Sequence, residues 1–154
     1  MQEPKTSIDK SNWPRGPWDD EPDRVEFEHA GLPCLMIRHP RHGNYCGYAA
    51  VPPGHPLHGK DYDTPEVDVH GGLTYADKCQ GDICHVPKPG EPEDVWWFGF
   101  DCAHGGDRAP GLEADLREAG IPRLSDYGEV YRDLSYVRAE TEKLAEQLAR
   151  VSHA

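Results

Sequence analysis

Apolar residues and one threonine recur near the C-terminus at alternating spacings of four and three positions. The series comprises Val130, Leu134, Val137, Thr141, Leu144, Leu148 and Val151. Side chains at this spacing lie on one side of an α-helix, which has about 3.6 residues per turn. The pattern predicts a helix at about 126–151 with one apolar seam. That seam either covers one face of a sheet or, because the same spacing suits a partner helix, forms a homodimer.

Five segments with the composition of β-strands precede this helix. They are residues 25–28, 33–38, 45–51, 67–76 and 95–100. Turn residues between the first three predict neighbouring strands joined by short connections. Paired glycines interrupt the fourth segment and indicate a bulge or a close approach of the backbone to another group. The fifth, VWWFGF, is the most apolar and is predicted to be the central strand.

These elements predict an α+β protein. We expect a small, mostly antiparallel sheet with long irregular loops, one short helix after Pro110 in GLEADLREAGIP, and the long C-terminal helix packed on the sheet. Residues 1–24 are polar and proline-rich and predict an N-terminal arm, whose Trp13 and Trp18 indicate docking onto the body. Residues 25–154 then form one domain, as their number allows.

Charge and composition exclude several function classes. The formal net charge is −12, and such a field repels phosphate backbones, so ordinary nucleic-acid binding is not expected. The sequence lacks an apolar run long enough to span a membrane and lacks the apolar segment of a signal peptide. We therefore expect a cytoplasmic protein. The motifs GxxxxGK[ST], GxGxxG, HExxH, GxSxG and CxxC are all absent from the sequence.

Potential ligands and catalytic groups follow two of the predicted strands. His70 precedes the paired glycines, while Asp101, His104 and Asp107 directly follow the tryptophan-rich strand. If the two strands are neighbours, their ends converge, and three such ligands with one open position are typical of catalytic zinc. We predict a metal site at His70, Asp101 and His104, with Asp107 or Glu66 as general base. The alternative is that these residues serve only as local caps and buried polar groups.

A second group is Cys79, Cys84 and His85 in a glycine-containing loop. Two thiolates and an imidazole could hold a structural zinc ion. Candidates for the fourth ligand are Cys102, His104 and Cys46. A redox pair and inert buried thiols are the alternatives. Because the sequence has five cysteines and no signal peptide, thiols or metal ligands are expected more than a disulfide framework.

The loop after the third strand, VPPGHPLHGKDYDTPE, is too long for a plain connection within a compact domain. His55, His58 and Lys60 lie within it. A solvated loop accounts for these residues, and the alternative is a mobile lid that brings one of them to a substrate.

Three stretches, CGYAAVPPGHPLHGKDYD, VDVHGGLTYA and WWFGFDCAHGGD, are long and distinctive. Through them the chain resembles a family of small proteins found in phage and bacterial genomes, over roughly residues 25–108 and more loosely the terminal helix. The family has no established activity to carry over. The resemblance implies a phage setting, in which a small protein that counters a host defence is one expectation.

Two hypotheses of function follow. In the first, the protein is a hydrolase that depends on zinc or another divalent metal and acts on a small polar substrate such as a nucleotide or an amide. In the second, it is a non-catalytic module that sequesters a small-molecule ligand or blocks a protein. There the Cys and His groups only stabilise the fold, and the terminal helix and acidic surface make the contacts.

Overall fold

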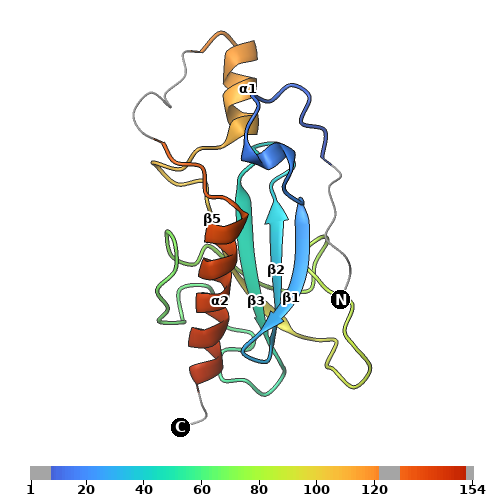
Figure 1. The fold of residues 1–154 in the computed structure, drawn as a ribbon. Coiled ribbons are helices and arrows are strands. Elements are labelled where there is room, and N and C mark those ends of the chain that lie inside the picture. The colour runs from blue at the N-terminus through green and yellow to red at the C-terminus, as the bar shows by residue number, and fades with distance from the viewer. Residues whose placement is uncertain (1–7, 122–128, 152–154) are drawn as a thin grey trace.

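The computed structural model of the chain describes residues 8–121 and 129–151. A five-stranded antiparallel sheet has the order β1-β2-β3-β5-β4. Its strands are β1 (Arg24–His29), β2 (Leu32–Arg38), β3 (Tyr45–Val51), β4 (Tyr75–Lys78) and β5 (Trp96–Asp101). The helices are the short 3-10 turn η1 (Pro17–Asp19), α1 (Pro110–Glu118) and α2 (Leu134–Arg150). Helix α2 runs along one face of the sheet (Figure 1), and the α+β prediction is confirmed.

The strand predictions hold for β1, β2 and β3 but need two corrections elsewhere. Of the segment 67–76, only the end enters the sheet, as the start of edge strand β4. Gly71 and Gly72 have φ angles of 67° and 79°, which turn the chain before it reaches the sheet. Strand β5 is second from the edge, and β3 is central. The apolar composition of β5 reflects burial on both faces of the sheet. A strand need not be central to be buried in this way, so composition alone did not give its position.

The C-terminal helix begins later than the predicted residue 126. Residues 122–128 lie outside the described part, but Val130 is described and is not helical. Its backbone N–H donates to Gly106 O and its carbonyl accepts from the Arg108 N–H, both at 2.8 Å. The helix starts at Leu134, where the Asp133 side chain caps it by accepting from the Tyr136 N–H at 2.9 Å.

The seam of α2 packs on the sheet of its own chain. Val137, Thr141, Leu144 and Leu148 are each 0% exposed. The helix approaches β3 closely, because a Cβ atom on Gly47 would lie 2.3 Å from the Thr141 hydroxyl oxygen. The first of the two predictions for the seam is therefore confirmed. The same burial leaves these four side chains no exposed surface for a partner helix, which argues against a homodimer through this seam.

The opposite face of the sheet is covered by residues 79–95, here called the strap. Its Ile83 and Val95 pack against Trp97, which is fully buried, and the His85 ring lies 5.5 Å from the Trp97 ring. The Arg24 guanidinium fastens the strap to β1 by donating to the carbonyls of Asp82 and Cys84 at 2.6 and 2.7 Å. Both faces of the sheet are thus covered over much of their area.

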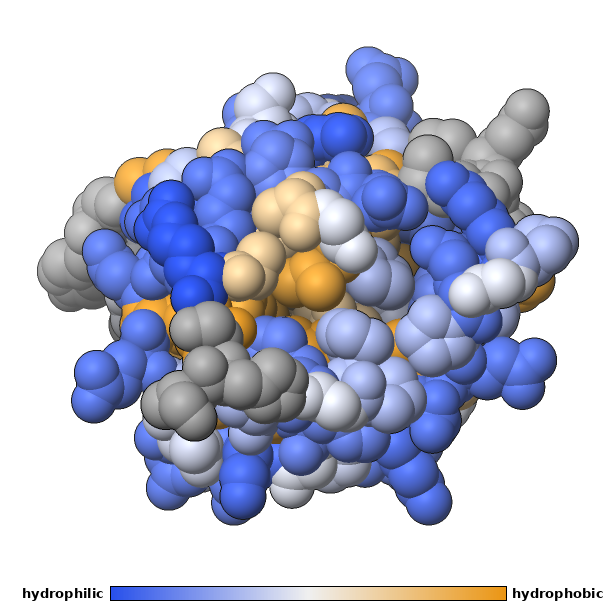
Figure 2. All heavy atoms as spheres, turned by 90° about the horizontal axis from the view of Figure 1, so that it is seen from below, coloured by the Kyte–Doolittle hydropathy of each residue, from blue (hydrophilic) through white to orange (hydrophobic). Residues whose placement is uncertain are grey.

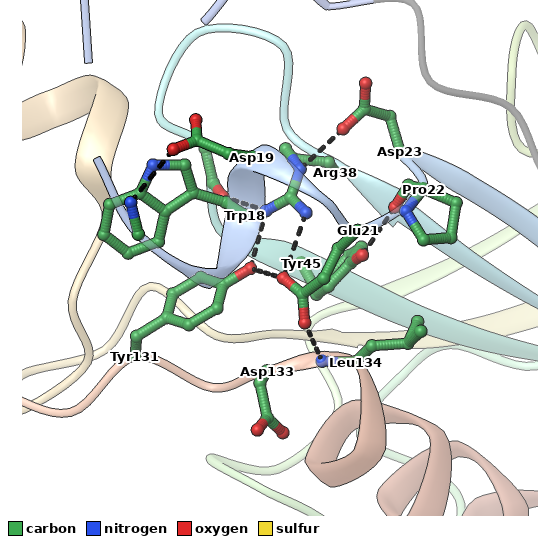
Figure 3. A network of polar contacts seen from close by, with 12 residues as sticks. Trp18, Asp19, Glu21, Pro22, Asp23, Arg38, Tyr45, Tyr131, Asp133 and Leu134 are labelled. Carbon is green, nitrogen blue, oxygen red and sulfur yellow. Dashed lines mark hydrogen bonds and ion pairs between the residues drawn. The ribbon is translucent and has the colours of Figure 1, made fainter. Parts of the chain in front are cut away.

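The N-terminal segment docks through a buried polar network (Figure 3). Arg38 of β2 has a fully buried side chain, and its Nε donates to Asp23 at 2.7 Å. Another nitrogen donates to the Tyr131 hydroxyl at 2.7 Å, and that hydroxyl donates to Glu21. Glu21 also accepts from the Leu134 N–H at 2.7 Å, at the start of α2. The network joins the N-terminal segment, the sheet and the last helix.

Tryptophan packing completes this docking, as the sequence suggested. Trp18 is 0% exposed and Trp13 is 8% exposed. Trp18 lies edge-on to Tyr131, with their ring centres 4.9 Å apart. Among the residues described, no helix has the length and apolar character needed to cross a membrane.

Candidate acid–base site

The site lies where the turn after Val69, the segment after β5 and the start of α2 meet. The His70 ring makes two short hydrogen bonds: Nε2 lies 2.7 Å from Asp107 Oδ2, and Nδ1 lies 2.7 Å from the Tyr136 hydroxyl. The other carboxylate oxygen of Asp107 accepts from Arg132 Nε at 2.9 Å. Four side chains therefore form one chain of hydrogen bonds, in the order Arg132, Asp107, His70 and Tyr136.

Asp107 is the anionic end of this chain. Its side chain is 1% exposed. Burial would raise the pKa of the carboxyl group, but hydrogen bonds from His70, Arg132 and the His104 backbone together lower it below its ordinary value. An ionised carboxylate only accepts hydrogen bonds, so His70 Nε2 must carry a proton. In the neutral imidazole, Nδ1 is then an acceptor that faces the Tyr136 hydroxyl.

Tyr136 is the outer group of the chain and is half-buried. Burial raises the pKa of its hydroxyl, and Glu140 raises it further, while Arg132 acts in the opposite direction. The Arg132 guanidinium lies 4.9 Å from the centre of the Tyr136 ring. The hydroxyl keeps its proton at neutral pH and gives it up only to a base in contact with it. His70 Nδ1 is such a base.

His104 and Asp101 extend the cluster toward the end of β5. The His70 and His104 ring centres are 5.9 Å apart, and His104 Nε2 lies 3.3 Å from Asp101 Oδ1. This nitrogen is buried and makes no hydrogen bond with the described residues, so the contact with Asp101 is close but lacks hydrogen-bond alignment. Gly71 allows the close packing, since a Cβ atom there would lie 2.2 Å from His104 Nε2. A side chain at position 71 would displace the ring.

The structure thus brings together four of the residues singled out in the sequence, His70, Asp101, His104 and Asp107. Both oxygens of Asp107 are engaged, which suits a carboxylate that orients His70 better than one that deprotonates water. Glu66, the other predicted base, is exposed, and its side chain makes no hydrogen bond or ion pair with the described residues. It does not join the cluster.

Two participants were missed in the sequence, namely Arg132 and Tyr136. They are four residues apart, the spacing that places side chains on one side of a helix, although Arg132 lies just before α2 begins. The apolar periodicity of the helix predicts only its buried side, where Val137 and Leu144 lie. The signal that could have found Arg132 and Tyr136 is their four-residue spacing next to the buried seam of the helix.

The second predicted metal group has a different role. Cys79 and Cys84 form a disulfide, so neither thiolate is available to a metal in this form. His85 packs against Trp97. The remaining thiols, Cys34, Cys46 and Cys102, are free, and burial raises the pKa of Cys34 and Cys46 to about 12. The expectation of thiols without a disulfide is wrong for this pair, because the turn at Gly81 brings its two Cα atoms within 4.6 Å.

In residues 8–121 and 129–151, no group of three or more His, Cys, Asp and Glu side chains is arranged to hold a metal ion. The physical reason is visible at His70, whose two ring nitrogens are both occupied by hydrogen bonds. A metal there would have to displace Tyr136 or Asp107. The predicted metal site stays a prediction.

The loop predicted to be either solvated or a lid is fastened at several points. His55 Nε2 lies 2.9 Å from the Leu148 carbonyl, and His58 Nε2 lies 2.7 Å from the Asp94 carbonyl. The Trp96 indole N–H donates to the Lys60 carbonyl at 2.8 Å. These contacts tie the loop to α2 and β5, which favours a static connection over a lid.

We expect the protein to lose stability in acid, below about pH 4. The folded-state pKa of Asp107 is lowered, so in this range the unfolded chain binds more protons than the folded one. The stabilisation is present above the unfolded pKa and is lost as the pH falls through the folded pKa. Thermal midpoints measured by circular dichroism from about pH 6 to pH 2 check this. Asp107→Asn should flatten the dependence, and an unchanged slope would assign it to other carboxylates.

Comparisons of the chain with protein-family models, with curated proteins and with solved structures gave no match. The function is therefore argued from the geometry of the site.

Proposed function

We propose that this protein is a hydrolase of a small polar ester or amide, in which Tyr136 and His70 carry the proton transfers. The observation that supports this most is the pair of 2.7 Å contacts at His70, one to an ionised carboxylate and one to a hydroxyl. A base held between an orienting carboxylate and a hydroxyl is the arrangement that activates nucleophiles in many hydrolases. Half-burial of Tyr136 leaves part of its side chain open to a substrate.

The reaction follows from the order of the groups. As Tyr136 Oη bonds to the acyl carbon, His70 Nδ1 takes the hydroxyl proton, and Asp107 stabilises the imidazolium that results. The imidazolium returns the proton to the leaving oxygen or nitrogen as its bond to the acyl carbon breaks. The oxygen of a water molecule then bonds to the acyl carbon as the water gives a proton to Nδ1. The bond between Oη and the acyl carbon breaks, the carboxylic acid departs, and Oη recovers its proton from His70.

The test is the hydrolysis of p-nitrophenyl acetate and of the p-nitroanilide of an acylated amino acid by the parent and by Tyr136→Phe. The variant keeps the ring and loses only the hydroxyl, so we expect it to fold normally and to lose about 10²–10⁴-fold in kcat. Tyr75→Phe is the matched control, since Tyr75 is also half-buried but packs against Tyr48 on the strap side of the sheet. Equal rates for the parent and Tyr136→Phe would overturn the proposal.

Chelation separates this proposal from the metal-dependent hydrolase predicted from the sequence. Activity that survives dialysis against 1,10-phenanthroline supports proton transfer by the side chains alone. Activity that is lost and then restored by zinc supports a metal held near His70, Asp101 and His104 instead.

A non-catalytic binding module is the second candidate. The observation that favours it is that both ring nitrogens of His70 and both carboxylate oxygens of Asp107 have partners, as in a cluster that only joins three segments of the chain. In the phage setting that the resemblance implies, such a module would sequester a ligand or block a protein. A parent protein that turns over neither substrate favours this candidate.

A further inference from the structure

A second site lies at the other end of the molecule, between the strap and the β1–β2 turn. A cavity of about 160 Å³ is open there. Its lining is mostly apolar and consists of Gly31, Leu32, Pro33, Pro52, Pro92 and Val95, with His85 and Glu91 as the polar members. Figure 2 views this end of the molecule and shows hydrophobic residues gathered near its centre, ringed by hydrophilic ones.

The cavity adjoins a smaller hollow of about 20 Å³ that reaches Glu26. Pro33, His85 and Glu91 line both spaces, so the two are neighbours. Glu26 lies on β1 and faces the strap side of the sheet, because the adjacent Phe27 belongs to the core on the α2 side. A carboxylate therefore lies at the inner end of an apolar chamber.

Glu26 is buried without full compensation. Its side chain is 6% exposed, and its Oε2 makes no hydrogen bond with the described residues. The nearest cation is Arg24, whose Nε lies 3.7 Å from Oε2, beyond hydrogen-bond distance. The other nitrogens of that guanidinium are committed to the strap carbonyls. Burying a carboxylate oxygen with no donor is costly, so this atom is suited to a donor supplied from outside.

His85 adds a second buried polar atom to the same place. Its Nε2 makes no hydrogen bond with the described residues. Burial lowers the pKa of His85, more than Glu91 and Glu26 raise it, so the ring is neutral at neutral pH. Glu91 accepts from the Lys88 N–H through Oε1 at 2.7 Å. The smaller hollow is also lined by Glu28 and Lys88, and Lys88 Nζ lies 3.7 Å from Glu28 Oε2. Because these two opposite charges pair with each other, the carboxylates of Glu26 and Glu91 leave the polar side of the chamber negative.

We propose that this chamber binds a small organic cation, an amine or amidine on a short apolar or aromatic body, with its charged head at Glu26. An apolar cavity of about 150 Å³ is large enough for a benzene ring, so the chamber has room for such a body. The charged head would donate to Glu26 Oε2 and to His85 Nε2. An inorganic ion is less suited, since the described residues offer no group of three His, Cys, Asp or Glu ligands. The site is separate from the His70 cluster and does not depend on the hydrolase proposal.

The test is calorimetric titration of the parent with benzylamine and benzamidine, and with benzamide and benzoate as neutral and anionic counterparts. We expect the cations to bind at least about tenfold more tightly than benzamide, and benzoate not to bind. Glu26→Gln should weaken cation binding by about tenfold or more and leave benzamide unaffected. Arg24, the ion-pair partner that is left behind, is partly exposed and keeps its hydrogen bonds to the strap carbonyls, so the thermal midpoint should stay close to that of the parent.

Glu146→Gln is the control, since Glu146 is an exposed carboxylate on α2 that pairs with His29. It should bind benzamidine as the parent does. Benzamide binding equal to that of benzamidine would reduce the chamber to an apolar cavity and overturn the proposal. Two other results would also overturn it. One is binding of Mg²⁺ or Ca²⁺ alone, seen as heat on titration, that is lost in Glu26→Gln. The other is binding of the organic cations that Glu26→Gln leaves unchanged.

Discussion

Replacing Arg38 by alanine is expected to lower the free energy of unfolding by about 3–5 kcal/mol. The guanidinium is fully buried and lies among Asp23, Glu21 and the hydroxyl of Tyr131. Its removal leaves an excess of buried negative charge and takes the donor at 2.9 Å from the Gly43 carbonyl. Burial would raise the pKa of Asp23, but Lys10, the Ile8 N–H and Arg38 together lower it, so the substitution removes one of the groups that stabilise the charged carboxylate.

Urea unfolding followed by circular dichroism measures this loss. Arg41→Ala is the matched control, because Arg41 also pairs with a carboxylate, Asp115, but has a side chain that is 76% exposed. An exposed pair contributes little, so that variant should differ from the parent by less than about 1 kcal/mol. Losses of similar size in the two variants would contradict a structural role for the buried network. A loss of this size is a large part of the total stability of a small domain.

Leu144→Ala is expected to cost about 2–5 kcal/mol. Leu144 is 0% exposed in the middle of the α2 seam, and α2 packs against β3 and β2. Truncation leaves a cavity that the tightly packed helix cannot close, given the contact between Gly47 and Thr141. The same unfolding measurement applies.

Leu112→Ala is the control for this prediction. Leu112 also lies on a helix, α1, but is 40% exposed, so its truncation should cost less than about 1 kcal/mol. If Leu144→Ala also cost less than about 1 kcal/mol, the seam would not be buried on the sheet. Light scattering of the parent would then test for a dimer, because the homodimer prediction requires a seam that is exposed on the monomer.

The site was only partly predictable for a reason that particular residues make clear. His70, Asp101, His104 and Asp107 were found because they end apolar segments, a signal carried by neighbouring sequence positions. Arg132 and Tyr136 come from a segment about 30 residues beyond Asp101 and reach the cluster only because α2 runs along one face of the sheet and begins beside His70. Their four-residue spacing is a local signal, but the contacts with His70 and Asp107 that give them a role are long-range. The metal assignment went further than spacing allows, since spacing cannot tell whether a ring nitrogen is already hydrogen-bonded.

The sequence by itself determined the α+β class and the local patterns behind it. These are the amphipathic period of α2, the alternation in β1 and the apolar runs of β2, β3 and β5. Only the tertiary structure decided the strand order, the partner Tyr131 against which Trp18 packs, the Cys79–Cys84 disulfide and the buried position of Glu26. Periodicity reports which side of an element is buried, because burial follows the geometry of one helix or strand. It does not report what that side is buried against, because the partner comes from elsewhere in the chain.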